Sequence, residues 1–184
     1  QGWLAVQSYD SRDGRLRALF DLAGVLREQG ELSAARDAYR VVAAQVEGQD
    51  ARVLTLDALA YVAALEGDRE EHQALRDRMD VAGWEDLSPV YRGQILYFRG
   101  LSHGALGEEE EARAWLDRAL AFAEAHQFNK LIFDAETALR ESLSSVSPRA
   151  SPPYRDEQVP EEILGVRRGL REMREAQAGV GEGV

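Results

Sequence analysis

Two apolar stripes, separated by a glycine, run through the segment from Leu16 to Glu47. In its first half, apolar side chains recur at steps of three and four residues, which is the spacing of one face of an α-helix. Gly30 interrupts the pattern, and a second stripe of the same period follows it. The stripes consist of Leu16, Leu19, Leu22, Ala23 and Leu26, and then of Ala35, Ala38, Tyr39, Val42, Ala43 and Val46. This pattern predicts an antiparallel helix pair, with small alanines where the backbones approach and one aromatic ring filling the space between them.

Two later segments repeat the pattern less regularly, with turn glycines at Gly67 and Gly107. In the second pair, Asp68 opens an Asp-x-x-Glu sequence, which predicts an N-terminal helix cap. His72 and Arg76 then occupy the places that hold the alanine and the aromatic ring in the first pair. We therefore expect the second pair to be the most loosely packed.

The connection between the second and third pairs carries its own signals. We expect Trp84 to be buried in a groove. Ser88-Pro89 predicts the start of the next helix, because proline at the first helical position loses no hydrogen bond. After the third pair, residues 130–145 predict one more helix that closes the array.

The composition changes in the C-terminal part of the chain. Residues 147–159 are rich in proline and serine, which predicts an extended linker, and residues 160–178 predict an amphipathic helix before a disordered tail, 179–184. The helix carries an apolar seam, spaced as helices that pack on one another are: Val159, Ile163, Val166, Leu170 and Met173. An isolated helix of this length is marginal. We expect the seam to dock on a second copy, as a homodimer contact that we favour, or in the groove of its own chain.

Four positions resemble the pattern of the tetratricopeptide repeat. Ala23 corresponds to its first small residue, Gly30 to its turn glycine, Ala35 to its second small residue and Tyr39 to its aromatic ring. The resemblance covers most of residues 16–146, and we take residues 1–146 as one helical repeat domain. It implies an all-α fold: a right-handed superhelical solenoid of antiparallel helix hairpins, followed by the extra C-terminal helix. The turn glycines are spaced more widely than in the standard repeat, which is similar to variants in bacterial helix-turn-helix regulators.

The resemblance implies a protein- or peptide-binding scaffold and no enzyme activity. Its role would be that of a sensor or oligomerisation module in a bacterial regulator of transcription. In this family the first helix of each pair lines a concave groove, and those places hold the expected ligand-binding residues Arg17, Phe20, Arg27, Asp57, Tyr61, Gln94 and Tyr97. The rings among them would grip an extended or helical apolar segment. The alternative, to which we give equal weight, is that the rings only pack between helices.

Charge and composition narrow the choice of partners. The net charge of −11 disfavours direct binding to nucleic-acid phosphates. No run of apolar residues approaches the length of a membrane span, so we expect a cytoplasmic protein with no membrane partner. The chain has no cysteine, which excludes disulfides, thiolate zinc sites and cysteine nucleophiles from it. Lys130 is its single lysine, and this bias toward arginine suggests a bacterial origin.

Residues that could carry chemistry are few. His72, His103 and His126 are far apart in sequence, and we expect structural roles for His72 and His103, which fall at packing positions between helices. Glu108 to Glu111 form an acidic run at a predicted helix start, where the helix dipole stabilises anions. A helical enzyme acting through such acidic clusters is the alternative function, disfavoured because the chain lacks a nucleophile motif, a metal-ligand spacing and a phosphate loop. We expect no metal and no cofactor.

Overall fold

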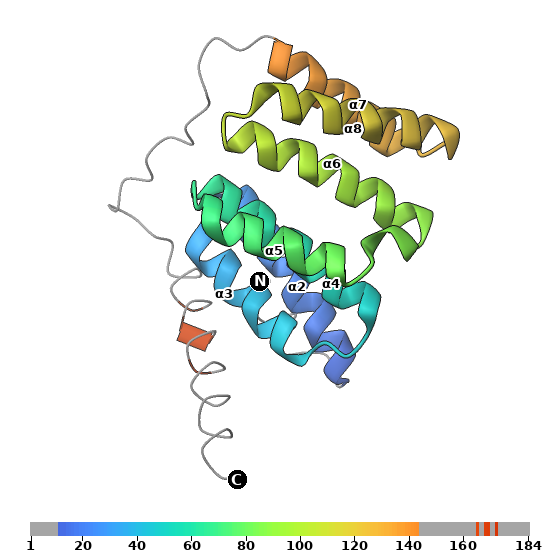
Figure 1. Ribbon diagram of the computed structural model, residues 1–184. Coiled ribbons are helices and arrows are strands. Elements are labelled where there is room, and N and C mark those ends of the chain that lie inside the picture. The colour runs from blue at the N-terminus through green and yellow to red at the C-terminus, as the bar shows by residue number, and fades with distance from the viewer. Residues whose placement is uncertain (1–10, 144–164, 166–167, 170–171, 173–184) are drawn as a thin grey trace. The chain divides into compact units, whose positions relative to one another are not determined.

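The computed structural model describes residues 11–143 together with Gly165, Arg168, Gly169 and Glu172, and these residues are all-helical (Figure 1). Seven α-helices and one short 3-10 helix lie in residues 11–143: α2 (Arg12–Glu28), α3 (Leu32–Gln45), α4 (Gln49–Leu65), α5 (Arg69–Val81), η1 (Trp84–Asp86), α6 (Pro89–Ala105), α7 (Glu109–Ala125) and α8 (Asn129–Leu143). The predicted all-α class is confirmed. Within the described residues, no helix has the length and apolar character needed to cross a membrane. The linker 147–159 and the tail 179–184 lie outside the described residues. So do the five apolar seam residues, Val159, Ile163, Val166, Leu170 and Met173.

The described residues form two compact units, of which the first contains α2 and α3. These helices pack as an antiparallel hairpin, as predicted. Tyr39 fills its centre, with 1% of its surface exposed, and the Phe20 ring meets it edge-on at 5.1 Å between centroids. Arg12, at the start of α2, connects this helix to the end of α3. It donates hydrogen bonds of 2.9 Å to the Glu47 carboxylate and to the Gln45 carbonyl.

The second unit contains α4 to α8, which pack as successive hairpins. In addition to its pairing with α5, helix α4 packs along α6, and α6 in turn packs along α8 (Figure 1). Two glycines of α6 allow close helix contacts. A Cβ atom at Gly100 would lie 2.7 Å from Leu116 of α7, and one at Gly93 would lie 2.8 Å from Leu131 of α8. Helix α6 therefore packs against α4, α7 and α8 within this unit.

Four helices end in the same turn. At Gly30, the glycine N–H donates to the Arg27 carbonyl and the next N–H donates to the Leu26 carbonyl, which is the Schellman arrangement. The turn requires a positive φ, which glycine adopts without a steric penalty. The φ angles are 81° at Gly30, 76° at Gly67 and 75° at Gly107, so the three predicted turns are confirmed. The fourth turn, between α7 and α8, has Gln127 at this position with a φ of 57°, so no glycine marked it in the sequence.

The predicted helix starts are also present. The Asp68 carboxylate accepts a hydrogen bond of 3.0 Å from the Glu71 N–H, as its capping sequence predicted. Helix α6 begins at Pro89, directly after Ser88. Local sequence signals thus mark where α5 and α6 begin and where α2, α4 and α6 end.

Candidate functional site

Three aromatic rings gather on two neighbouring helices of the second unit. Tyr61 lies on α4, and Tyr97 and Phe98 lie on α6. The Phe98 ring is 5.3 Å from the Tyr61 ring and 5.5 Å from the Tyr97 ring. All three are half-buried, so each ring packs on a neighbour and also reaches solvent. We call these residues the aromatic face. Tyr61 and Tyr97 were predicted as groove residues, whereas Phe98, which joins them, was not.

The other predicted groove residues have varied surroundings. In the first unit Arg17 is exposed, Phe20 packs against Tyr39, and the Arg27 guanidinium lies 3.5 Å from the Glu28 carboxylate. In the second unit Gln94 is exposed on α6. The alignment of the seven residues along one groove stays a prediction.

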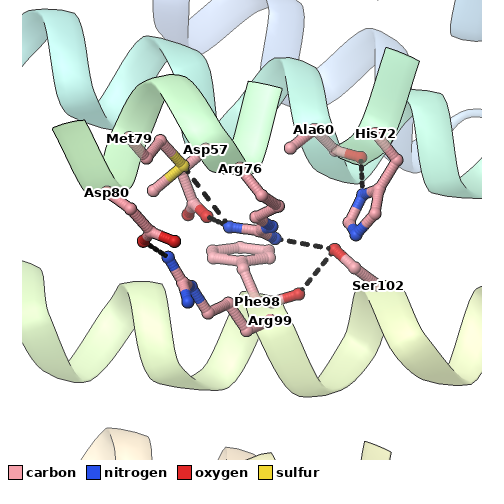
Figure 2. Close-up of polar contacts among 9 residues, drawn as sticks. All are labelled: Asp57, Ala60, His72, Arg76, Met79, Asp80, Phe98, Arg99 and Ser102. Atoms are coloured by element: carbon pink, nitrogen blue, oxygen red, sulfur yellow. Dashed lines mark hydrogen bonds and ion pairs between the residues drawn. The ribbon is translucent and has the colours of Figure 1, made fainter. Parts of the chain in front are cut away.

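Asp57, the remaining groove candidate, is buried in an ion pair. Only 3% of its surface is exposed, and its Oδ1 lies 2.5 Å from Nη1 of Arg76 on α5 (Figure 2). A ligand would have to break this pair to reach the carboxylate. Asp57 is therefore a structural partner of Arg76 in this geometry.

Arg76 is the centre of a network that connects three helices (Figure 2). Its Nη1 contacts the Asp57 carboxylate of α4 and also the Met79 sulfur at 3.5 Å, while its Nη2 donates to Ser102 Oγ of α6 at 3.0 Å. Ser102 Oγ donates in turn to the Phe98 carbonyl at 2.8 Å, so its donor and acceptor are both used. We call Asp57, Arg76 and Ser102 the Arg76 network.

Burial and pairing act in opposite directions on the guanidinium of Arg76. Burial lowers its pKa, and the charge and hydrogen bond of Asp57 raise it. A guanidinium remains protonated in proteins, so Arg76 carries a full positive charge inside the fold. That charge is tolerated because a carboxylate, a hydroxyl and a thioether surround it.

A second ion pair lies beside this network. Arg99 Nη2 donates to Asp80 Oδ1 at 2.6 Å, across α6 and α5. Arg99 is 8% exposed and its guanidinium lies over the rings of Trp84, at 4.6 Å, and Trp115, at 5.0 Å. Trp84 is buried, as predicted. The two ion pairs together attach α5 to both α4 and α6.

His72 occupies the expected small-residue place of α5 and is buried there. Its Nδ1 lies 2.9 Å from the Ala60 carbonyl, and since a carbonyl only accepts, Nδ1 carries the proton. Burial lowers the pKa of His72, and the charges of Arg76 and His103 lower it further, against the Ala60 hydrogen bond and the Glu108 carboxylate. The imidazole is therefore neutral at neutral pH.

This lowered pKa predicts a loss of stability in mild acid. Below the ordinary value of 6.5 the unfolded chain protonates His72 before the folded chain does, so the free energy of unfolding falls as the pH falls toward the folded pKa. The slope from one such group is at most about 1.4 kcal/mol per pH unit. Urea unfolding of wild type and His72→Gln, at about pH 7.5 and about pH 5.5, measures this contribution. The variant should lose less stability between the two pH values, and an equal loss would contradict the assignment.

The start of α5 is attached to the turn between α6 and α7 by a separate polar cluster. Arg69 binds the Glu108 carboxylate and donates to the Leu106 carbonyl, and His103 Nδ1 lies 2.7 Å from Glu108 Oε2. The hydrogen bond from His103 lowers the pKa of Glu108, burial opposes this, and Arg69 adds to the lowering. Glu108, the first residue of the acidic run, therefore connects the start of α5 to the turn between α6 and α7. Among the described residues, no three histidine or acidic side chains gather where they could hold a metal ion.

Sequence reasoning missed the Arg76 network although it held one clue to it. His72 and Arg76 stood at places where the repeat pattern expects a small residue and a ring, and we interpreted them as poor packing. The structure instead buries both and connects each by hydrogen bonds to a neighbouring helix. A charged residue at an expected core position is a signal for a buried partner, and Asp57 is that partner.

Comparisons with known proteins identify no family. No protein-family model, no curated protein and no solved structure matches this chain. The structure itself shows an all-helical protein, with seven α-helices in its described residues that pack as hairpins. The tetratricopeptide identity stays a prediction.

Proposed function

We propose that this chain is a protein- or peptide-binding scaffold whose recognition surface includes the aromatic face. The observation that supports this most directly is the position of Tyr61, Tyr97 and Phe98, which are half-buried on adjacent helices, with the Phe98 ring in contact with both tyrosines. Tyrosine and phenylalanine rings provide large contact areas while losing few rotatable bonds, and binding energy concentrates on such residues. A partner with an apolar side chain would cover the parts of the rings that solvent now reaches.

The Arg76 network supports the same proposal because it positions the rings before a partner arrives. Asp57 lies one helical turn before Tyr61 on α4, and Ser102 lies one turn after Phe98 on α6 and donates to its carbonyl. Arg76 connects these two turns from α5. A surface held in its binding geometry loses less conformational entropy on association, which raises affinity.

The tetratricopeptide resemblance adds detail to the proposal. The ligand would be an extended or helical apolar segment, and the chain would be the sensor or oligomerisation module of a cytoplasmic bacterial regulator. The C-terminal helix would supply a homodimer contact. Glu108, the first residue of the acidic run, directly precedes α7 and pairs with Arg69. No observation in the described residues favours the enzyme alternative, so we propose the scaffold alone.

Replacing Tyr61 and Tyr97 together by alanine should weaken peptide binding at least about tenfold, which corresponds to about 1.4 kcal/mol. The measurement starts from an array of apolar and amphipathic peptides, selects those that bind the wild-type chain, and compares their affinities by fluorescence anisotropy. Val81→Ala, at a side chain of α5 that is 91% exposed, is the control. Helical circular dichroism of the double variant should match wild type.

Equal affinity of the double variant and wild type for every selected peptide would place the binding surface elsewhere. A loss of affinity in the Val81→Ala control would show a general loss of binding competence instead. An array without any bound peptide would contradict the scaffold proposal as stated.

A further inference from the structure

A pocket of about 390 Å³ opens between η1, α6 and α7, and it shares no residue with the aromatic face. We propose that it binds an aromatic carboxylate, either as a free small molecule or as the C-terminal aromatic residue of a peptide. Its volume lies within the range of small-ligand sites and is too small for a folded partner. The proposal concerns a second binding site and does not depend on the function proposed for the aromatic face.

The walls of the pocket suit a flat apolar group. Trp84 of η1, Leu96 of α6 and Phe122 of α7 line it, and most of the lining surface is apolar. Aromatic rings bind other rings by offset stacking or edge contacts, in addition to the burial of apolar area. A ligand ring entering here would meet an indole and a phenyl group.

These walls are held in place by contacts outside the pocket. The Arg99 guanidinium lies 4.6 Å from the Trp84 ring centroid, and Asp80 holds Arg99 by a hydrogen bond of 2.6 Å. The Phe122 ring lies 4.4 Å from the ring of His126. The pocket is therefore formed by the fold of this chain, as ligand sites usually are.

The charged groups of the pocket favour an anion. Arg92 and Arg118 line it, and Glu85 is the one carboxylate among the lining residues. Arg92 lies 5.2 Å over Phe122, and Arg118 lies 4.1 Å over Trp115. Within the part of the chain that the structure describes, neither arginine forms an ion pair.

A carboxylate matches this arrangement better than a neutral or cationic group does. A guanidinium offers two parallel N–H donors to a carboxylate, and such charge-assisted bonds are stronger than neutral ones. The chain as a whole has a net charge of −11, so a pocket lined by two arginines and one glutamate is a local exception. The ring would occupy the apolar wall, and the carboxylate would reach the arginines at the rim.

The test uses indole-3-propionate as the probe and its neutral primary amide as the matched control. The chain has three tryptophans, Trp3, Trp84 and Trp115, so its ¹⁵N-labelled indole N–H groups give three resolvable nuclear magnetic resonance signals. Trp84→Phe assigns the signal of the pocket. The acid should shift the Trp84 signal and bind at least about tenfold more tightly than the amide, as one charge-assisted hydrogen bond predicts.

The variant Arg92→Gln with Arg118→Gln should abolish the preference for the acid, so that the acid and the amide bind it with equal affinity. Arg118 is exposed, so Arg118→Gln alone tests the same preference if the double variant loses helical structure.

The peptide Gly-Gly-Trp, with a free or an amidated C-terminus, distinguishes the two sources of the ligand. Tighter binding of the free-acid peptide than of indole-3-propionate identifies a polypeptide end, and the reverse identifies a small molecule. Equal binding of acid and amide, or an unmoved Trp84 signal with both probes at their solubility limit, would overturn the proposal.

Discussion

Replacing Asp57 by asparagine should destabilise this protein by about 3–5 kcal/mol, because it leaves the buried guanidinium of Arg76 without its counter-charge. Arg76 is 6% exposed and Asp57 3% exposed, so water cannot replace the lost carboxylate without opening the helix packing. A typical domain is stable by about 5–15 kcal/mol, so this one change would remove a large part of the total. Urea unfolding monitored by circular dichroism measures the effect.

The double variant Asp57→Ala with Arg76→Met distinguishes a charge effect from a loss of packing. Removing both charges leaves no uncompensated ion, so the double variant should remain within about 2 kcal/mol of wild type. The single variants Asp57→Ala and Arg76→Met should each lose more stability than the double variant, which is a non-additive result. Additive losses would contradict the ion-pair interpretation.

A surface pair provides the matched control for this prediction. Lys130 and Asp134 of α8 form an ion pair of 2.6 Å, but the Lys130 side chain is 89% exposed. Exposed pairs of this spacing contribute only about 0.3–0.5 kcal/mol. Lys130→Ala should therefore change the free energy of unfolding very little, although it also breaks an ion pair.

The second large effect is expected at Gly100 of α6, where alanine should destabilise the fold by about 1–3 kcal/mol. The added Cβ would lie 2.7 Å from Leu116 Cγ and 3.1 Å from the Leu116 backbone nitrogen. The Leu116 side chain could rotate, but its backbone can yield only if α7 moves away from α6. This steric cost should exceed the gain of about 1 kcal/mol that alanine normally brings to a helix interior.

Gly104, one turn further along the same helix, provides the comparison. An added Cβ there would lie 3.8 Å from the Ala112 Cβ, which is an ordinary contact distance. Gly104→Ala should therefore stabilise the fold by up to about 1 kcal/mol through helix propensity alone. If chemical denaturation shows the same change in the free energy of unfolding for Gly100→Ala and Gly104→Ala, α6 and α7 do not approach as closely at Gly100 as described.

Local sequence signals were sufficient for most of the helices and their turns. The apolar period predicted the hairpin of α2 and α3, and Gly30, Gly67 and Gly107 predicted their turns. The reason is physical: helix period, capping and the positive φ of a Schellman turn depend on residues a few places apart. At Gln127 the sequence predicted that a new helix follows, but it carried no glycine to mark the turn, because a non-glycine residue adopts the positive φ there.

The candidate site depended on contacts that no local pattern encodes. Arg76 meets Asp57 at a sequence separation of 19 residues and Ser102 at 26. The sequence placed Arg76 at an expected packing position, but it placed Asp57 in the ligand groove and gave no expectation for Ser102. Only the packing of α4, α5 and α6 decides that the three residues meet. The same holds for Phe98, which joins Tyr61 to Tyr97.

Sequence alone therefore determined that this protein is all-α, that its helices pair as hairpins and where most hairpins turn. Tertiary structure alone decided that Arg76 is a buried ion-pair partner, that Asp57 is taken by it, and that Trp84, Arg92 and Arg118 surround one pocket. A helix records its own period in its sequence, whereas a buried charge is stable only beside a partner that folding brings from another helix.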